Sequence, residues 1–415
     1  MKVEEHNSGW SVPVLPRHEA YRVYSIRAPP QVVLGCGAVE RVGGLAKLFG
    51  ERALVVTGRG AVESKRVDRV LKPLEEAGVQ VEVYGEVEPE PDMSLAERVA
   101  EHARRLAESR GLDVVVGFGG GSSLDMAKIA SIAPLNRDPV RSYVGVDKVP
   151  RKGLPLILIP TTAGSGSEVS RVAVVVSEED EVKVGVVSDN VVADVAIVDP
   201  ELTVTMNPRL TASTGVDALS HAIEAYMSLG ANSYTDPLAL EAVSLISWGL
   251  RRAYADGEDL EARAAMSEAA LLAGLAFSNA GNCAGHAAAY AFAVKYRVPH
   301  GISCGIALPY IMKFNSLAVP ERLADIAVAM GVEVSGLSVR EAAQLAVAEV
   351  YDLLLDLNLP TTLEDVGVPE EDIMSLASNM LKSRRMLDVN PRKVGVEEAR
   401  RIFEAMWHGD VESKL

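Results

Sequence analysis

The sequence predicts an α/β fold in its first half and an all-helical fold in its second half. In the first half, apolar runs rich in β-branched residues alternate with segments of helical periodicity, as in a mainly parallel sheet covered on both faces. After VDPEL (198–202) alanine-rich helical patterns take over, and clear strand patterns become scarce. We therefore expect an α/β domain over residues 1–204 and an all-helical domain over residues 205–415.

The individual elements follow from local patterns. Strands are expected at ALVVTG (53–58), QVEVYG (80–85), DVVVGFGGG (113–121), PLILIPTT (155–162) and VADVAIVD (192–199). Between them, SLAERVAEHARRLAESR (94–110) has the periodicity of a helix. The N-terminal VYSIRAP (23–29) is a candidate edge strand that could pair with a second copy of the chain. In the second half, segments such as PLALEAVSLISWGLRRAYA and REAAQLAVAEVYDLLLDL predict helices.

Composition excludes several kinds of partner. The net charge of −16 over 415 residues disfavours binding to nucleic acid or to an anionic membrane. No apolar run approaches the roughly 18 residues of a membrane span, and the N-terminus has no apolar signal core. The three cysteines are widely spaced, which argues against a disulfide framework or a structural zinc site. We expect a soluble cytoplasmic protein.

A glycine-rich loop follows one of the predicted strands. In DVVVGFGGGSSLDMAK an apolar strand runs into Gly119, Gly120 and Gly121, and Ser122 then opens a helical segment. Glycines let a backbone approach a ligand, and the free N–H groups of a helix N-terminus favour phosphate. The alternative is a tight strand-to-helix turn without a ligand, because GFGGGS only approximates the GxGxxG pattern.

A second loop of small and hydroxyl residues, PTTAGSGSEVS (160–170), follows the next strand. Ligands of open α/β sheets bind outside the carboxyl ends of the strands, so two such loops on one edge favour a dinucleotide site. A P-loop ATPase is disfavoured because the sequence has no GxxxxGK[ST] pattern.

The second half carries a carboxylate and three histidines that together suit a metal ion. Asp217 and His221 are four residues apart and would share one helix face, while His286 and His300 follow downstream. One carboxylate and three imidazoles suit zinc or iron(II). Taken singly, each residue also has an ordinary interpretation, since Asp217 could support a helix start and an isolated helical histidine is more often a core or surface residue.

Four motifs in this order resemble the iron-containing (group III) alcohol dehydrogenase family: GGGSSLDMAK, TTAGSGSEVS, GVDALSHAIEAYMS and GHAAAYAFAVKYRVPHG. The resemblance covers about residues 20–410, and the last motif, with its Gly-His start and Pro-His-Gly end, is specific. It implies a Rossmann-like dinucleotide-binding domain, an all-helical metal-binding domain and an active site in the cleft between them.

The resemblance also implies roles for individual residues. The metal, Fe2+ with Zn2+ as the alternative, would be held by Asp217, His221, His286 and His300. The phosphate-binding residues of the family carry over to Gly119, Gly120, Gly121, Ser122, Thr161, Thr162 and Ser167.

Two positions depart from the family pattern. Tyr290 stands where many members have a second histidine, and as residue i+4 from His286 it would face the same cleft. A tyrosine there could donate a proton or a hydrogen bond, but its reference pKa of about 10 makes it a poor base, and it could equally be a wall of the pocket. Cys304 stands where the family often has asparagine.

The choice of nicotinamide is predicted from Gly58 and Arg59. The family places an aspartate just after the first strand, where a carboxylate selects NAD by binding the ribose 2′-OH. Gly58 removes that charge and bulk, and Arg59 could meet a 2′-phosphate with its guanidinium. We therefore expect NADP rather than NAD, the alternative being that Gly58 is only a turn and Arg59 points to solvent.

The function implied by the resemblance is a metal-dependent alcohol dehydrogenase or aldehyde reductase. It would transfer hydride between a small alcohol or aldehyde and NADP(H), with the metal as Lewis acid, and work as a homodimer or higher oligomer. The alternative is a cyclase or lyase like dehydroquinate synthase, which has a similar fold, nucleotide and metal arrangement. Such enzymes need many basic residues for a phosphorylated substrate, and near His286–His300 the sequence offers only Lys295 and Arg297.

Overall fold

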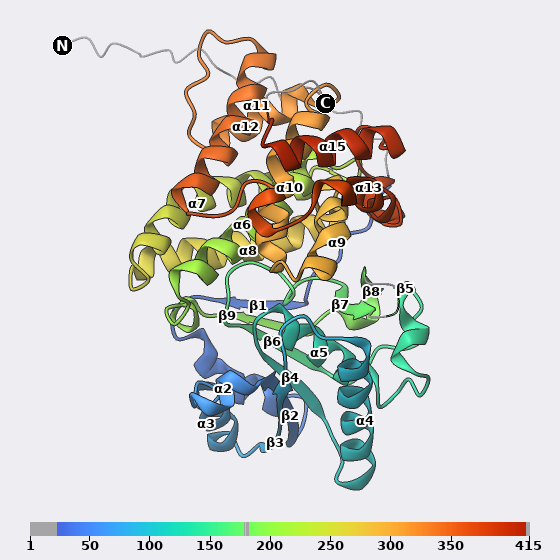
Figure 1. Cartoon of the computed structure of the whole chain (residues 1–415). Helices are drawn as coiled ribbons and strands as arrows, with labels where there is room; N and C mark the ends of the chain where they lie inside the picture. Colours follow the sequence, from blue (N-terminus) through green and yellow to red (C-terminus); the bar gives the residue numbers. More distant parts are fainter. Residues whose placement is uncertain (1–22, 178, 180–181, 412–415) are drawn as a thin grey trace, which may run out of the picture.

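The computed structural model describes residues 23–177, 179 and 182–411, and these form an α/β part followed by an all-helical part (Figure 1). The α/β part is built on a six-stranded parallel sheet in the order β1-β9-β6-β4-β2-β3. Its strands are β1 (Gln31–Leu34), β2 (Arg52–Gly58), β3 (Gln80–Val87), β4 (Val114–Gly119), β6 (Leu156–Pro160) and β9 (Val195–Val198). All five predicted strands are present, which confirms the predicted fold class.

Helices cover both faces of this sheet. Alternate residues of β2 and β4 point to opposite faces, so that Leu54 and Val115 pack in one core while Val55 and Val116 pack in another. One core includes residues of α4 and α5, and the other includes residues of α1 and α3. The helices of this part are α1 (Val42–Lys47), α2 (Arg59–Glu63), α3 (Asp68–Glu76), α4 (Met93–Ser109) and α5 (Gly121–Ile132). Burial on both faces explains why the central strands are uninterrupted apolar runs.

A second, three-stranded sheet was not predicted. It has the order β5-β8-β7, with β7 and β8 antiparallel. Its strands are β5 (Gly145–Val146), β7 (Val172–Ser177) and β8 (Val182–Val187). Lys183 of β8 and Val174 of β7 line the cavity described below, so this small sheet helps to position the site.

The second part is helical throughout the residues that the structure describes. Its helices are α6 (Pro208–Met227), α7 (Thr235–Ala255), α8 (Leu260–Ala280), α9 (Ala284–Tyr296), α10 (His300–Asn315), α11 (Pro320–Ala329), α12 (Val339–Asp356), α13 (Ile373–Met380), α14 (Arg384–Leu387) and α15 (Val396–His408). One large core, rich in alanine, holds these α-helices together. Short 3₁₀ helices of this part are η6 (Glu364–Val366) and η7 (Glu370–Asp372), and those of the α/β part are η2 (Ala38–Arg41), η3 (Val140–Tyr143), η4 (Asp189–Val191) and η5 (Pro200–Thr203).

The start of α6 follows the usual chemistry of a helix N-terminus. The Asn207 side chain accepts a hydrogen bond from the Leu210 N–H, and Pro208 occupies the first helical position. The predicted domain boundary at residue 204 falls just before this cap, after η5. The division into two domains stays a prediction.

Within one chain, residues 23–29 form no strand, and the edge strand next to β9 is β1, which begins at Gln31. The pairing of residues 23–29 with a second copy stays a prediction. The Arg27 backbone forms hydrogen bonds with the Asn279 side chain: its N–H donates to Asn279 Oδ1 at 2.7 Å, and its carbonyl accepts from the Asn279 amide at 2.8 Å. Within the described ranges, no helix is long and apolar enough to cross a membrane.

Candidate active site

A cavity of about 600 Å³ lies where the carboxyl ends of the parallel strands face the helical part. Residues that follow β2, β4 and β6 line one side, and Asp217, His221 and His300 from α6 and α10 line the other. Ligands of open parallel sheets bind at this edge. The cavity therefore joins the two groups of residues that the motifs single out.

The glycine loop and the hydroxyl-rich loop lie side by side on the sheet edge. The backbone N–H of Thr161 donates to the Gly119 carbonyl at 2.9 Å, and a Cβ on Gly120 would lie 3.5 Å from the Thr162 side chain. Gly119 has φ +147°, which L side chains rarely adopt, and it turns the chain directly toward α5. The first N–H groups of α5 therefore open toward the cavity, as at a phosphate-binding helix N-terminus.

All seven residues predicted to bind phosphate line the cavity: Gly119, Gly120, Gly121 and Ser122 from the glycine loop, and Thr161, Thr162 and Ser167 from the second loop. Ser167 differs from the others because its hydroxyl is already engaged. It donates to Asp125 Oδ1 at 2.6 Å and accepts from Lys128 Nζ at 2.9 Å. Lys128 is fully buried, so Ser167 contributes to a buried polar network beneath the loops.

The four predicted metal ligands come together at the opposite side of the cavity. The distances from Asp217 Oδ1 to the imidazole Nε2 atoms are 3.5 Å for His300, 3.9 Å for His221 and 4.0 Å for His286. Donors that share one zinc ion at about 2.0–2.2 Å are roughly 3 to 4 Å apart. Asp217 Oδ1 and His286 Nε2 are buried with no hydrogen-bond partner among the described residues, as expected of atoms that bind an ion. The residues therefore fit a divalent metal.

Glu224 fixes the orientation of His286. Its Oε1 accepts from His286 Nδ1 at 2.6 Å, and its Oε2 accepts from the backbone N–H groups of Cys283 at 2.7 Å and His286 at 3.2 Å. A Cβ on Gly285 would come within 2.6 Å of the carboxylate, so glycine at that position leaves room for it. With its proton held on Nδ1, His286 presents a free lone pair on Nε2.

Burial keeps the other two histidines neutral. It lowers the pKa of His221 to about 4 and, together with the charge of Lys183, holds the pKa of His300 well below its usual range. Burial also opposes protonation of His286, but Glu224 outweighs it and raises the pKa of that ring. Neutral imidazoles are the form that binds metals. The His221 ring stacks on Phe277 and on His286, at centroid distances of 4.2 and 4.6 Å.

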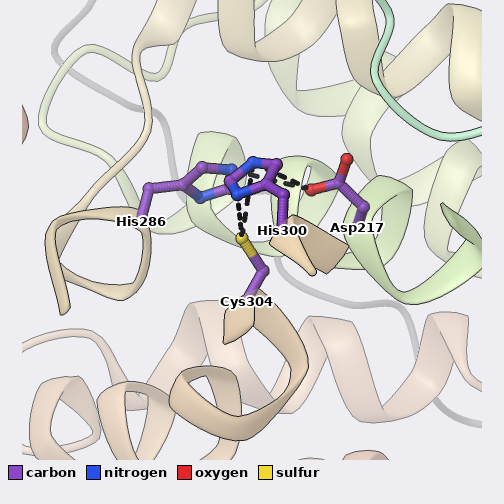
Figure 2. Close-up of side chains that lie close together, drawn as sticks. All are labelled: Asp217, His286, His300 and Cys304. Atoms are coloured by element: carbon purple, nitrogen blue, oxygen red, sulfur yellow. Dashed lines mark hydrogen bonds and ion pairs between the residues drawn. The ribbon is translucent and has the colours of Figure 1, made fainter. Parts of the chain in front are cut away.

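Cys304 adds a fifth donor atom. Figure 2 shows its thiol pointing toward the same point as Asp217, His286 and His300. The donor atoms of these four residues lie within 4.8 Å of one another, and Cys304 Sγ is 3.7 Å from the His300 ring nitrogens. His221 lies outside this tighter group, although its Nε2 is 3.9 Å from Asp217. His221 remains a candidate ligand, because its Nε2 atom lies within 4.0 Å of the same Asp217 oxygen as the other two rings.

Tyr290 lies beside the metal-binding residues. Its ring centroid is 5.5 Å from that of His300 and 6.3 Å from that of His286, and it lines the cavity. Burial raises the pKa of its hydroxyl above the ordinary value, which excludes a role as base at neutral pH. A hydrogen-bond donor and a wall of the pocket are the two roles that fit this position.

Gly58 ends β2 and Arg59 begins α2, and both residues line the cavity. Arg59 is 63% exposed and pairs loosely with Glu88, with 4.0 Å between the charged atoms. Arg66 lines the cavity here as well and donates to Ser64 Oγ at 3.0 Å. This part of the cavity is therefore lined by two arginines and by Glu88, and Glu90 lines the cavity two residues further along the chain.

Comparisons with known proteins identify the family. The model described as "Iron-containing alcohol dehydrogenase" matches residues 29–200, and that described as "Fe-containing alcohol dehydrogenase family, C-terminal" matches residues 211–407.

The chain belongs to the iron-containing alcohol dehydrogenase family.

Full-length relatives agree with this assignment. The long-chain-alcohol dehydrogenase 1 of Geobacillus thermodenitrificans is 40% identical over 92% of this chain and 96% of its own length. A sulfoacetaldehyde reductase of Bilophila wadsworthia is 38% identical over 90% of this chain and 97% of its own. The solved structure of an alcohol dehydrogenase from Oenococcus oeni is 36% identical, covers 93% of this chain and 100% of its own, and has a TM-score of 0.88.

Family membership confirms the resemblance and the class of the enzyme. This iron-containing alcohol dehydrogenase is an oxidoreductase that acts on alcohols or aldehydes, and the cyclase alternative is not supported. The family implies a metal and a nicotinamide dinucleotide as cofactors.

The motifs did not reveal three residues of this alcohol dehydrogenase site. Glu224 lies on the same face of α6 as Asp217 and His221, at i+7 and i+3, and that spacing was the available signal. Arg66 lines the cavity from the connection between α2 and α3, Arg385 lines it from α14, and no local pattern marks either residue.

Proposed function

We propose that Asp217, His221, His286 and His300 hold one divalent ion, Fe2+ or Zn2+, at which this enzyme interconverts a small alcohol and its aldehyde. The convergence of three imidazole Nε2 atoms on one carboxylate oxygen, within 4.0 Å, is the observation that carries the proposal. A bound ion of this kind supplies Lewis acidity toward an alcohol or carbonyl oxygen. Glu224 holds His286 in the tautomer that leaves Nε2 free.

We propose that the two loops at the sheet edge bind the cofactor pyrophosphate. The support is the open N-terminus of α5 together with the contact between Gly120 and Thr162, which lets backbone N–H groups from both loops face one ligand. The nicotinamide then lies toward the helical part of the cavity, and hydride moves between it and the substrate carbon.

We propose that the cofactor is NADP(H). Gly58 carries no carboxylate to accept from a ribose 2′-OH, and the guanidinium groups of Arg59 and Arg66 border the same end of the cavity. Glu88 weakens this preference by its charge, but both Glu88 and Arg59 are exposed, where ion pairs are weak.

We propose that Tyr290 acts as a hydrogen-bond donor to the substrate oxygen. Its hydroxyl makes no hydrogen bond within the described part of the chain, and its raised pKa keeps the proton on the oxygen. We further propose that the protein works as a homodimer or higher oligomer, because no strand of the described residues pairs with the outer edge of β1.

The test is the absorbance of reduced nicotinamide with a panel of small alcohols and aldehydes, measured on protein loaded with Fe2+ or Zn2+. We expect net oxidation of the cofactor with aldehydes and net reduction with primary alcohols. The absence of any net turnover with either class, in protein that binds the nucleotide, would contradict the proposal.

A further inference from the structure

A second cavity, of about 260 Å³, adjoins the first beside Tyr290. Lys183, Tyr290 and Arg385 line both cavities, so the two spaces share a wall next to the metal-binding residues. This second cavity is lined by four cationic side chains, Lys183, Lys382, Arg384 and Arg385, and by no carboxylate of the described residues. In a chain of net charge −16, such a concentration of positive charge is unusual.

Two of these cations have no partner. Lys183 pairs with Glu90 at 3.0 Å, and Arg384 pairs with Asp388 at 3.6 Å. The side chains of Arg385 and Lys382 form no ion pair or hydrogen bond with the described residues. A guanidinium presents a planar fork of donors that matches a carboxylate or sulfonate. Arg385 is therefore available to bind an anion at the border of the two cavities.

The positive charge lies close to the proposed metal ligands in the first cavity. Lys183 Nζ is 5.8 Å from the centroid of the Tyr290 ring, and that centroid is 5.5 Å from the His300 ring. Lys183 and Arg385 line both cavities together with Tyr290. Their positive charge therefore lies beside the place where the substrate oxygen would bind.

Binding of the cofactor phosphates does not account for the four cationic side chains of the second cavity. The loops proposed for the pyrophosphate follow β4 and β6, and the arginines near the proposed 2′-phosphate end follow β2. Arg385 belongs to α14, in the helical part, and lines the second cavity together with Tyr290.

We propose that the substrate is a short-chain aldehyde, or the matching primary alcohol, with an anionic group at its other end, and that Arg385 binds this group. The proposal rests on the proposed function. In the reduction, hydride from the reduced nicotinamide adds to the carbonyl carbon, one proton adds to the oxygen, and the cofactor leaves oxidised. The anionic group takes no part in the reaction and serves to hold and select the substrate.

The experiment compares substrates that differ in charge. Succinate semialdehyde carries a carboxylate, sulfoacetaldehyde carries a sulfonate, and methyl 4-oxobutanoate is the neutral ester of the first. We expect kcat/KM for at least one anionic aldehyde to exceed that for the ester by about 10- to 100-fold, the range of a hydrogen bond to a charged group. The better of the two anions identifies the group that the site takes.

The variants separate Arg385 from general effects of charge. In Arg385→Met the KM for the preferred anion should rise about tenfold or more with a smaller change in kcat, and Arg385→Lys should recover part of the loss. Arg340→Met is the matched control, because Arg340 is an exposed arginine of α12 that lines neither cavity. It should keep the preference for the anion.

Two outcomes overturn the proposal: equal or better turnover of the ester by the unmodified protein, or an unchanged preference in Arg385→Met. If no aldehyde is turned over, the proposed function fails instead. Calorimetric titration with 4-hydroxybutyrate then decides the anion site by itself, since binding that is lost in Arg385→Met supports the site and absent or unaltered binding overturns it.

Discussion

Replacing Glu224 by glutamine tests how the chain prepares the metal site. The two side chains have nearly the same shape, so the change removes a charge and one acceptor without opening a cavity. Glu224 Oε2 faces two backbone N–H donors, at 2.7 and 3.2 Å, and Oε1 faces His286 Nδ1 at 2.6 Å. An amide nitrogen cannot accept a hydrogen bond, so the glutamine must turn its oxygen toward the backbone donors and its NH₂ group toward His286.

The consequence is a change of tautomer. With a donor in front of it, His286 Nδ1 must accept, and the proton of the neutral ring moves to Nε2. That atom is 4.0 Å from Asp217 Oδ1 and is the one proposed to bind the ion. Loss of an outer-shell partner usually lowers metal affinity by about 10- to 100-fold, which equals roughly 1.4–2.8 kcal/mol. Because Glu224→Gln also places a proton on the His286 Nε2 atom that would bind the ion, we expect a loss of metal affinity at the upper end of this range.

The assay is titration of the metal-free protein with Zn2+ against a competing chelator. Glu241→Gln is the matched control, since Glu241 is an exposed carboxylate on α7. Circular dichroism checks that both variants are folded. An affinity of Glu224→Gln within about twofold of the unmodified protein would refute the reasoning, because loss of the hydrogen bond from His286 Nδ1 to Glu224 should lower the affinity at least about tenfold.

Three further changes test other parts of the site. Arg59→Ala should weaken NADP(H) binding by about 1.5 kcal/mol and change NAD(H) binding little. This value is the lower end for a hydrogen bond to a charged group, because Arg59 is exposed. Equal catalytic efficiency with both cofactors in the unmodified enzyme would contradict the preference for NADP. Tyr290→Phe should keep the metal and lower kcat by less than about 100-fold, the scale of a full proton relay, and unchanged kinetics would leave Tyr290 as a pocket wall. Burial raises the pKa of Glu168 to about 7, above its unfolded value, so its contribution to stability is present at low pH and lost as the pH rises through about 7. Urea unfolding should therefore show a loss of up to about 3 kcal/mol between about pH 5 and pH 8 that Glu168→Gln lacks, and equal pH dependence of the two proteins would count against it.

The sequence predicted the parallel sheet well because its central strands are buried on both faces. β4 is fully buried along VVVGFG, so its pattern is an uninterrupted apolar run bounded by glycines. The small sheet was missed although VAVVVS of β7 and VKVGVV of β8 are rich in valine. At the N-terminus, VYSIRAP has a strand-like composition. The backbone N–H and carbonyl of Arg27, however, form hydrogen bonds with the Asn279 side chain and not with a neighbouring strand.

The motifs also predicted which residues gather at the site, since Asp217, His221, His286 and His300 all face one point. Spacing alone could not give the partners of these residues. Glu224 meets His286 across 62 positions of the chain, and only the packing of α9 against α6 brings them together. Arg385 reaches the cavity from α14, a four-residue helix with no pattern of its own.

Elemental analysis of the purified protein beside its His286→Ala variant tests the central claim most directly. The variant removes one of four proposed donors, including an Nε2 atom that is buried without a hydrogen-bond partner in the described structure. We predict about one equivalent of iron or zinc per chain in the unmodified protein after dialysis, and little metal and no turnover in His286→Ala. Undiminished metal in a folded His286→Ala protein would contradict the assignment of the site.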